Sequence, residues 1–89
     1  MSVIRKYKLT IDNDFSILIP RLPEILDIRY QDDDLYLWAL VDLEKDEVFL
    51  HFKIIGTGFD FNPNGLSFIR TVHDPRGFVW HVFYKHPEI

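Results

Sequence analysis

The sequence predicts an all-β protein, a small antiparallel sandwich or partly open barrel of about seven strands. Seven short segments have the two-residue alternation or the continuous apolar character of strands, and turn signals separate them. No segment has convincing helical periodicity. At 89 residues the chain is expected to be a single domain, residues 1–89, and its aromatic content of 16% suits a core built from large rings.

Three strands are expected in the N-terminal third of the chain. Residues 3–9 alternate apolar and polar side chains, residues 15–19 follow a turn-like Asp-Asn-Asp sequence, and residues 25–31 alternate again. Pro20 and Pro23 separate the second strand from the third, because proline donates no backbone N–H to a ladder.

Four longer strands are expected in the rest of the chain. The sequence EKDE is interpreted as a hairpin connection between the first two of them. Asp74-Pro75-Arg76-Gly77 has proline and glycine at the positions that suit a type I turn, so it should join the last two. The four segments are 35–43, 48–55, 66–73 and 78–84.

The formal net charge of −4 is unevenly distributed. Most acidic residues lie between positions 24 and 47, whereas Arg5, Lys6 and Lys8 form the one basic cluster. A protein that binds a nucleic-acid duplex usually has a broader basic face, so the sequence disfavours nucleic acid as a partner. There is no cysteine and no apolar stretch of the ~20 residues that span a membrane. We therefore expect a cytoplasmic protein without a membrane partner.

The three longest predicted strands are apolar on both faces. In residues 35–43, for example, Leu37 and Ala39 oppose Tyr36 and Trp38. An antiparallel sheet commonly exposes one face to water, and seven strands cannot easily cover a second apolar face. The pattern favours a homo-oligomer or a ligand on that face. The alternative is a compact barrel whose bent strands contribute to both sides.

The sequence Gly56-Thr57-Gly58 ends the strand at 48–55. Neither the phosphate-loop pattern G-x-x-x-x-G-K-[ST] nor the dinucleotide-binding pattern G-x-G-x-x-G is present, and no helix is expected after this turn. The glycines are more typical of a turn, where they supply a positive φ or space for a neighbouring side chain. Ligand contact through this turn is the second interpretation.

The polar residues favour neither a metal site nor catalysis. His51 and His81 are expected in strands, where a strand pair could place them opposite each other. The four histidines, His51, His73, His81 and His86, do not have the spacing of zinc ligands. Asp32-Asp33-Asp34 is interpreted as a solvated hairpin tip. No serine lies on a strand-to-helix elbow, and no carboxylate pair stands out, so we expect no enzyme, no metal and no cofactor.

Aromatic and cationic residues form the strongest candidate binding constellation. Aromatic rings stack on bases, and arginine pairs with phosphates. If the last two strands pair through the turn at 74–77, Arg70 should lie near Trp80 and His81 in a small anion-binding pocket. The alternative is an ordinary hairpin with a solvent-facing arginine. The constellation comprises Tyr36, Trp38, Lys53, Arg70, Arg76 and Trp80.

Several sequences along the chain resemble a family of short, mostly uncharacterised proteins encoded by bacteriophages and prophages. The resemblance rests on IPRLPEIL, LYLWALVD, FKIIGTG, FIRTV and VWHVFY, and it covers nearly the whole chain. Arg70 departs from the pattern, since a glycine is common there. The family offers no active site to transfer. The resemblance implies expression in an infected bacterium and, by analogy with other small phage proteins, interference with host defence.

Together these observations predict a protein that binds and sequesters a small ligand, with a nucleotide immune signal as the first candidate. The expected ligand contacts are Gly56, Thr57, Gly58, Arg70, Trp80 and His81. The alternative is an interaction module that inhibits a host defence protein through an apolar strand face or its acidic surface. A small hydrolase is a third, weaker alternative.

Overall fold

The computed structural model describes residues 1–12 and 14–85 and confirms the all-β fold class. All pairings are antiparallel, and the described residues contain no helix. The seven strands are β1 (Ser2–Leu9), β2 (Phe15–Pro20), β3 (Glu24–Gln31), β4 (Asp34–Asp42), β5 (Glu47–Gly56), β6 (Ser67–His73) and β7 (Val79–Lys85).

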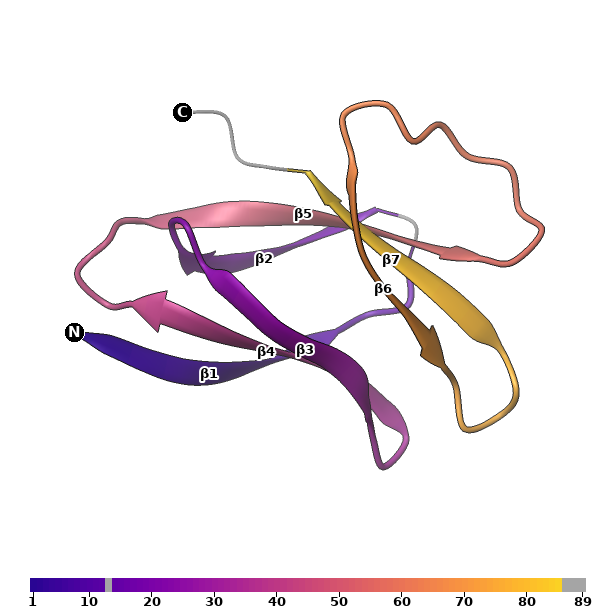
Figure 1. Cartoon of the computed structure of the whole chain (residues 1–89), viewed down its shortest axis with the longest axis horizontal. Coiled ribbons are helices and arrows are strands. Elements are labelled where there is room, and N and C mark those ends of the chain that lie inside the picture. The colour runs from indigo at the N-terminus through magenta and orange to yellow at the C-terminus, as the bar shows by residue number, and fades with distance from the viewer. Residues whose placement is uncertain (13, 86–89) are drawn as a thin grey trace.

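The strands form two open sheets (Figure 1). Sheet A has the order β1-β4-β3, and sheet B has the order β2-β5-β7-β6. The predicted hairpins at Asp32-Asp33 and at 74–77 are both present. The hairpin expected at 44–47 is not. Both edges of β4 are already paired, with β1 and β3, so β5 crosses to the other sheet and pairs with β2 and β7.

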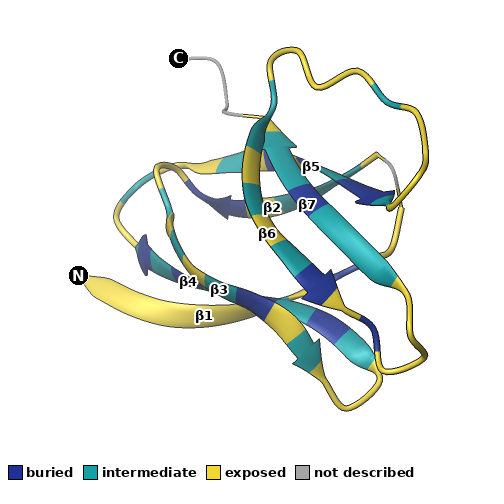
Figure 2. Ribbon diagram, turned by 45° about the vertical axis from the view of Figure 1, so that its right-hand side comes forward, coloured by how far each residue is buried: buried dark blue, intermediate teal, exposed yellow. Residues whose placement is uncertain are grey.

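The core lies between the two sheets and follows the two-residue alternation of the strands (Figure 2). In β4 the odd-numbered residues are buried and the even-numbered ones are half-buried. The buried residues of the core cluster are Leu9, Ile19, Ile28, Leu35, Leu37, Ala39, Val41, Leu50, Phe52, Ile54, Val72 and Val82.

The second apolar face of the long strands is partly covered from within the chain. On sheet A, Lys6 of β1 lies over the ring of Tyr36 in β4. On sheet B, the segment between β5 and β6 places Phe61 against Phe83, with ring centroids 5.0 Å apart. Phe49 remains 69% exposed. Neighbouring segments of the same chain thus cover part of the second apolar face. A homo-oligomer that covers the rest stays a prediction.

Edge strands β3 and β6 connect the two sheets. Each contains a register shift, between Ile25 and Asp27 in β3 and between Phe68 and Arg70 in β6. Bulges redirect side chains at sheet edges. Asp27 and Arg70 meet across the gap in an ion pair of 2.7 Å, so this pair joins sheet A to sheet B.

Candidate ligand-binding site

The turn after β5 is a structural turn of the kind the glycines predicted. The Phe59 N–H donates to the carbonyl of Gly56 at 3.3 Å, and Gly58 has a φ of 93°. The Thr57 N–H donates to the carbonyl of Val79 in β7 at 3.4 Å, so this amide already has a partner. Only glycine adopts the Gly58 conformation without strain.

Gly56 is required for close packing rather than for its conformation. A Cβ atom at this position would lie 3.0 Å from the ring of Phe59 and 3.2 Å from the ring of Trp80. Two aromatic rings therefore occupy the space that any larger residue would need. The expectation that glycine makes room for a neighbouring side chain is confirmed.

His81 lies in a polar cluster on the outer face of sheet B. Its Nε2 is 2.8 Å from the Thr57 hydroxyl, and its Nδ1 is 2.9 Å from the hydroxyl of Thr71. Thr71 is the cross-strand neighbour of His81 in β6. Both imidazole nitrogens therefore have hydroxyl partners from the same molecule.

Trp80 faces the other side of β7. Successive residues of a strand point to opposite faces, so Trp80 and His81 cannot line one surface. The Trp80 ring packs against the core, and its Nε1 donates to Asp74 at 3.3 Å. Arg70 lies opposite Val82 and directs its guanidinium to Asp27.

The six predicted ligand contacts therefore divide into three environments and do not converge on one pocket. A cavity of about 390 Å³ does lie beside Gly56 and Trp80. Its charged lining residues are Asp12 and Asp60, and two carboxylates disfavour a phosphate there. The assignment of these residues to a ligand stays a prediction, and the geometry supports a different surface better.

A buried carboxylate that the sequence reasoning missed organises one end of the fold. The Asp74 side chain is fully buried and accepts hydrogen bonds from three side chains, which together with it form the Asp74 cluster. The Arg76 guanidinium donates to both carboxylate oxygens, at 3.1 and 3.0 Å, and the Tyr30 hydroxyl donates at 3.1 Å. The third donor is the Trp80 indole N–H. The sequence signal for this cluster was the turn Asp74-Pro75-Arg76, which places an aspartate near an arginine. The contact with Tyr30 in β3 could not be predicted, because Tyr30 is remote from this turn in the sequence.

The Asp74 cluster shifts the pKa of three of its members, and the hydrogen bonds of the Arg76 side chain to Asp74 raise the pKa of Arg76. Hydrogen bonds from the Arg76 side chain and backbone hold the pKa of Asp74 well below its usual range. Burial, with the neighbouring Asp74 carboxylate as the second cause, raises the pKa of Tyr30 to about 12. The cluster is therefore charged at neutral pH, and both oxygens of its buried carboxylate accept hydrogen bonds.

A second group of candidate binding residues lies on the solvent-facing side of sheet A. It brings the basic cluster of β1 next to the aromatic residues of β4, which are distant in the sequence. Pairing of β1 with β4 places Lys6 opposite Trp38 and Lys8 opposite Tyr36. Pairing of β3 with β4 places Arg29 opposite Tyr36 on the other side. We call this surface the aromatic–cation face; it comprises Lys6, Lys8, Arg29, Tyr36 and Trp38.

The aromatic–cation face has close internal geometry. The Lys6 Nζ lies 4.1 Å from the ring centroid of Tyr36 and 5.7 Å from that of Trp38. The Arg29 guanidinium lies 5.9 Å from the Trp38 ring, and the two rings are 6.1 Å apart. These distances are within the range of cation–π attraction.

The cations of this face differ in their ionic partners. Lys8 pairs with Asp34 at 3.5 Å, and Arg29 pairs with Asp27 at 3.8 Å. Lys6 instead hydrogen-bonds the side-chain amide of Gln31, and it has no carboxylate partner among residues 1–12 and 14–85. Lys6 is therefore the cation that an anionic ligand would recruit at least cost.

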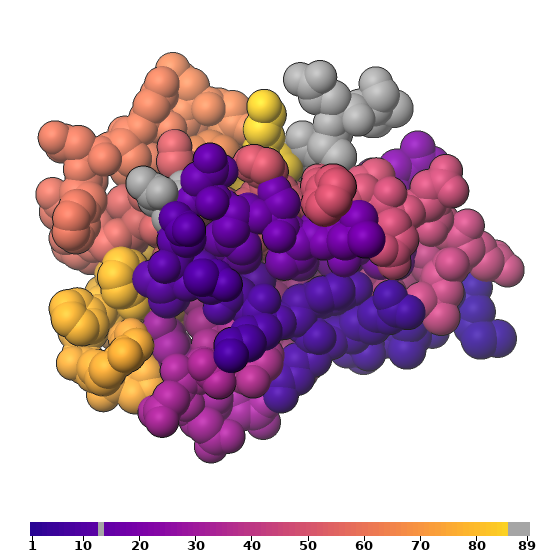
Figure 3. Space-filling model, turned by 180° about the vertical axis from the view of Figure 1, so that it is seen from behind, coloured from indigo at the N-terminus to yellow at the C-terminus, as the bar shows by residue number. Residues whose placement is uncertain are grey.

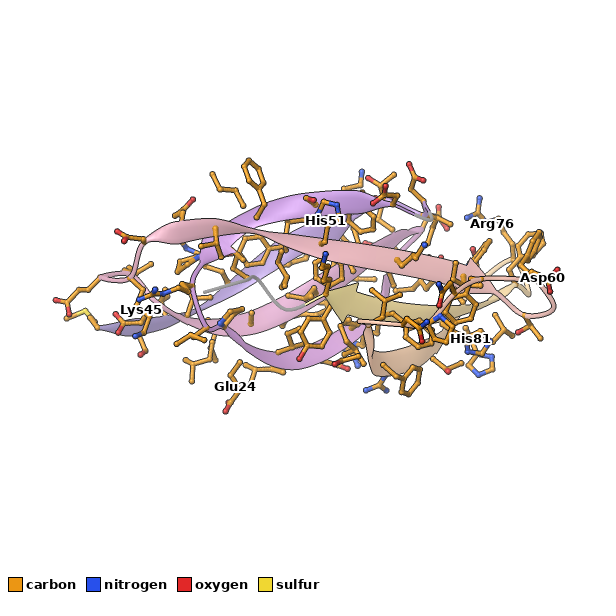
Figure 4. The ribbon with its side chains drawn as sticks, turned by 90° about the horizontal axis from the view of Figure 1, so that it is seen from above. Glu24, Lys45, His51, Asp60, Arg76 and His81 are labelled. Atoms are coloured by element: carbon orange, nitrogen blue, oxygen red, sulfur yellow. The ribbon has the colours of Figure 1, made fainter. Side chains whose placement is uncertain are left out.

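The histidines give no support to a metal centre. No group of three potential ligands occurs within the described residues, and His86 lies outside them. His51 is paired with Lys85 and His81 with Ile55, so the idea that the two histidines face each other is wrong (Figure 4). His51 and the partner of His81, Ile55, are four positions apart along β5, about 13 Å, which is more than the two side chains can bridge.

The structure does place a serine and an aspartate beside one histidine. The Ser16 hydroxyl contacts His51 Nδ1, and an Asp14 oxygen lies 3.3 Å from His51 Nε2. The imidazole is 56% exposed and the carboxylate 72% exposed, so water screens both. A catalytic relay works through desolvated, preorganised groups, and this surface contact does not have those surroundings.

Comparisons with known proteins identify a family. The model of a domain of unknown function, DUF7352, matches residues 1–89. No curated protein and no solved structure matches the chain. Within the described residues, no helix has the length and apolar character needed to cross a membrane.

Proposed function

Since the chain belongs to the DUF7352 family, whose function is unknown, we propose a function from the geometry of its surface. The protein acts as a non-catalytic binding protein that holds a nucleotide on the aromatic–cation face. The observation that carries this proposal is the position of Lys6, which lies over two neighbouring aromatic rings and has no carboxylate partner within the described part of the chain.

The residues of this face match the two chemical parts of a nucleotide. Tyr36 and Trp38 are half-buried, so part of each ring remains accessible to a base. Stacking of a base on an aromatic side chain contributes about 1–3 kcal/mol. An exposed cation–π contact is worth only about 0.5–1 kcal/mol, so Lys6 can leave the Tyr36 ring for a phosphate with a net gain.

The charge balance of the face favours a small nucleotide over a long nucleic acid. Asp34 pairs with Lys8, and Asp27 is shared between Arg29 and Arg70. The whole chain carries a net charge of −4. Binding of a long phosphate backbone depends on many unpaired cations. A ligand with one or two phosphates requires only Lys6 and its neighbours.

The biological setting follows from the resemblance to phage proteins rather than from this surface. Sequestration of a nucleotide immune signal in the cytoplasm of an infected bacterium is the role that fits both. It needs no bond to be made or broken, which agrees with a site built from rings and cations.

Isothermal titration calorimetry with a cyclic dinucleotide tests the proposed site. We expect saturable binding by the wild type, and an affinity roughly tenfold or more weaker for Trp38→Ala. Lys6→Ala should also weaken binding and reduce its dependence on salt. Lys53→Ala is the matched control, because it removes one positive charge from β5 in sheet B and should leave the affinity within about twofold.

The same titration with oligo(dT) distinguishes a small nucleotide from single-stranded nucleic acid as the ligand. Tighter binding of oligo(dT) than of mono- and dinucleotides would identify single-stranded nucleic acid as the ligand. Absence of saturable binding to every nucleotide, or an unchanged affinity in Trp38→Ala, would overturn the proposal.

A protein partner is the second candidate function, and a different surface favours it. An apolar groove of about 420 Å³ opens between the sheets on the side of β3 and β6. Leu22 and Phe68 at this groove are 67% and 57% exposed. Capture of a defence protein that is lost in Leu22→Asp but kept in Trp38→Ala would favour this function.

A further inference from the structure

Strand β1 forms an unusually open edge of sheet A. Residues Ser2 to Lys6 are all exposed, and the ribbon of β1 is exposed along nearly its whole length in Figure 2. Two of these residues are apolar: Ile4 is 59% exposed and Val3 is 38% exposed. Figure 3 shows the indigo atoms of β1 on the molecular surface. An open strand edge of this kind is a template for pairing with another strand.

The other three sheet edges carry a bulge or a terminal proline, whereas β1 is regular and has only the charges of Arg5, Lys6 and Lys8 to discourage pairing. Strands β3 and β6 each contain a bulge, and they lie against each other through the Asp27–Arg70 ion pair. Strand β2 has six residues and ends in Pro20. Strand β1 has eight residues, pairs with β4 in unbroken register and contains no proline.

The hydrogen-bond pattern shows which backbone groups of β1 face the open edge. The Leu43 N–H donates to the Met1 carbonyl at 3.1 Å, which continues the register of β1 with β4. Hydrogen-bonded and non-hydrogen-bonded pairs alternate along an antiparallel ladder. The odd-numbered residues of β1 therefore bond to β4. The N–H and C=O groups of Ser2, Ile4 and Lys6 point away from β4 toward the open edge.

We propose that β1 pairs antiparallel with β1 of a second copy of this chain, with the two-fold axis at Ile4. The two Ile4 residues then exchange both backbone hydrogen bonds and bury their side chains together. Ser2 lies opposite Lys6 of the partner subunit, and Val3 lies opposite Arg5 of the partner subunit. No like charges are directly opposed, a condition that favours strand pairing.

The neighbouring registers are less favourable. An axis at Arg5 would place two arginines directly opposite each other, and an axis at Lys6 would do the same with two lysines. An axis at Val3 would leave only three paired residues from Ser2 to Ile4. The register centred on Ile4 pairs five residues, from Ser2 to Lys6, and is the longest without a like-charge pair.

This dimer would extend the proposed nucleotide site. A two-fold axis perpendicular to the sheet keeps both aromatic–cation faces on one side of a six-stranded sheet. The two β4 strands would be three strand spacings apart, about 14 Å. Lys6 of the partner subunit would lie beside Ser2, so each copy contributes a cation near the other's surface. This consequence rests on the proposed function, whereas the strand pairing does not.

Cysteine substitutions test the register without any ligand, because the chain has no cysteine of its own. Opposed residues of a hydrogen-bonded pair have Cα atoms about 5.5 Å apart, within the range a disulfide can bridge. Mild oxidation of Ile4→Cys should convert most of the protein to a covalent dimer. In the control Ser2→Cys the two cysteines would lie about 15 Å apart, too far for a disulfide, so this variant should stay largely monomeric.

Sedimentation measurements on the unmodified chain give an independent test. The interface is small, so we expect a dimer whose fraction rises with concentration, with a Kd of tens of micromolar or weaker. Ile4→Pro removes an N–H that faces the open edge and should give a monomer with an unchanged circular dichroism spectrum. Equal cross-linking of both cysteine variants, or a monomer at all concentrations, would overturn the pairing. Nucleotide binding by such a monomer would still leave the proposed function in place.

Discussion

The Asp74 cluster and the aromatic–cation face use the same side-chain chemistry for different ends. Each combines aromatic residues with a cation. In the Asp74 cluster the carboxylate is buried and accepts hydrogen bonds from Tyr30, Arg76 and Trp80. On the aromatic–cation face the charged groups are exposed, and Lys6 contacts rings and an amide rather than a carboxylate.

The difference shows that burial and saturation decide what such a cluster can do. A buried, fully bonded carboxylate holds its neighbours in one arrangement, and removal of one partner leaves the others unsatisfied. An exposed cation over a ring has spare hydrogen-bonding capacity for a ligand. We therefore assign stability to the Asp74 cluster and binding to the aromatic–cation face, and the following predictions separate the two.

The largest effect on stability is expected from Asp74→Asn. The neutral amide keeps one acceptor oxygen but forms no ion pair with the Arg76 guanidinium, and its NH2 group would face donors of the cluster such as those of Tyr30 and Trp80. We expect the midpoint of thermal unfolding to fall by roughly 10 °C or more. Nucleotide affinity, measured where the variant is folded, should change by less than about twofold. A stable Asp74→Asn variant that loses nucleotide binding would reverse the assignment.

The largest effect on binding is expected from the aromatic–cation face, and Trp80→Phe provides the contrast. Trp80→Phe keeps an aromatic ring in the core but loses the hydrogen bond to Asp74, so it should lower stability by about 1–2 kcal/mol and leave binding unchanged. Trp38→Phe should weaken binding more than it lowers stability. Chemical denaturation and calorimetry on both variants measure the two quantities, and equal effects on binding would contradict the separation.

Two tyrosines give a smaller and closely matched comparison. The Tyr30 hydroxyl donates to Asp74, whereas the buried Tyr7 hydroxyl has no hydrogen-bond partner among residues 1–12 and 14–85. Tyr30→Phe should therefore cost about 1–2 kcal/mol in the free energy of unfolding. Tyr7→Phe removes an unsatisfied group and should be neutral or stabilising by up to about 1 kcal/mol. Urea denaturation measures the free energy of unfolding of both variants. A larger loss of stability in Tyr7→Phe than in Tyr30→Phe would contradict this prediction.

The pH dependence of stability should carry the signature of the Asp74 cluster. The lowered pKa of Asp74 contributes stability that is present above the ordinary aspartate pKa of about 4 and is lost as the pH falls below it. The raised pKa of Tyr30 contributes stability that is present below pH 10 and is lost as the pH rises toward 12.

Thermal unfolding measured from pH 2 to pH 12 tests both limbs. Asp74→Asn should flatten the acid limb, although Asp42 should retain a smaller slope because the Glu44 N–H lowers its pKa as well. Tyr30→Phe should flatten the alkaline limb. Unchanged limbs in these variants would show that other groups control the pH dependence.

Strand positions were predictable because their signals are local. Alternation and turn residues placed all seven strands within one or two residues of their bounds, and Asp-Pro-Arg-Gly identified the last hairpin. The same alternation already separated Trp80 from His81, because adjacent residues of a strand face opposite sides. The prediction of one pocket lined by both Trp80 and His81 did not take this alternation into account.

The arrangement of the sheets was not predictable in the same way. Nothing in EKDE distinguishes a hairpin from a connection between sheets, since the choice depends on whether β4 has a free edge. Likewise, Arg70 pairs with Asp27 because two bulged edge strands happen to meet. These contacts join residues that are remote along the chain.

The sequence by itself determined the fold class, the strands and the residues with binding chemistry, because periodicity and turn chemistry act over a few neighbouring residues. Only the tertiary structure decided which of those residues meet. Pairing of β1 with β4 brought Lys6 to Tyr36 and Trp38, and packing of β3 against the β6–β7 hairpin brought Tyr30 to Asp74. Both outcomes follow from burial of the shared core, which is a property of the whole chain.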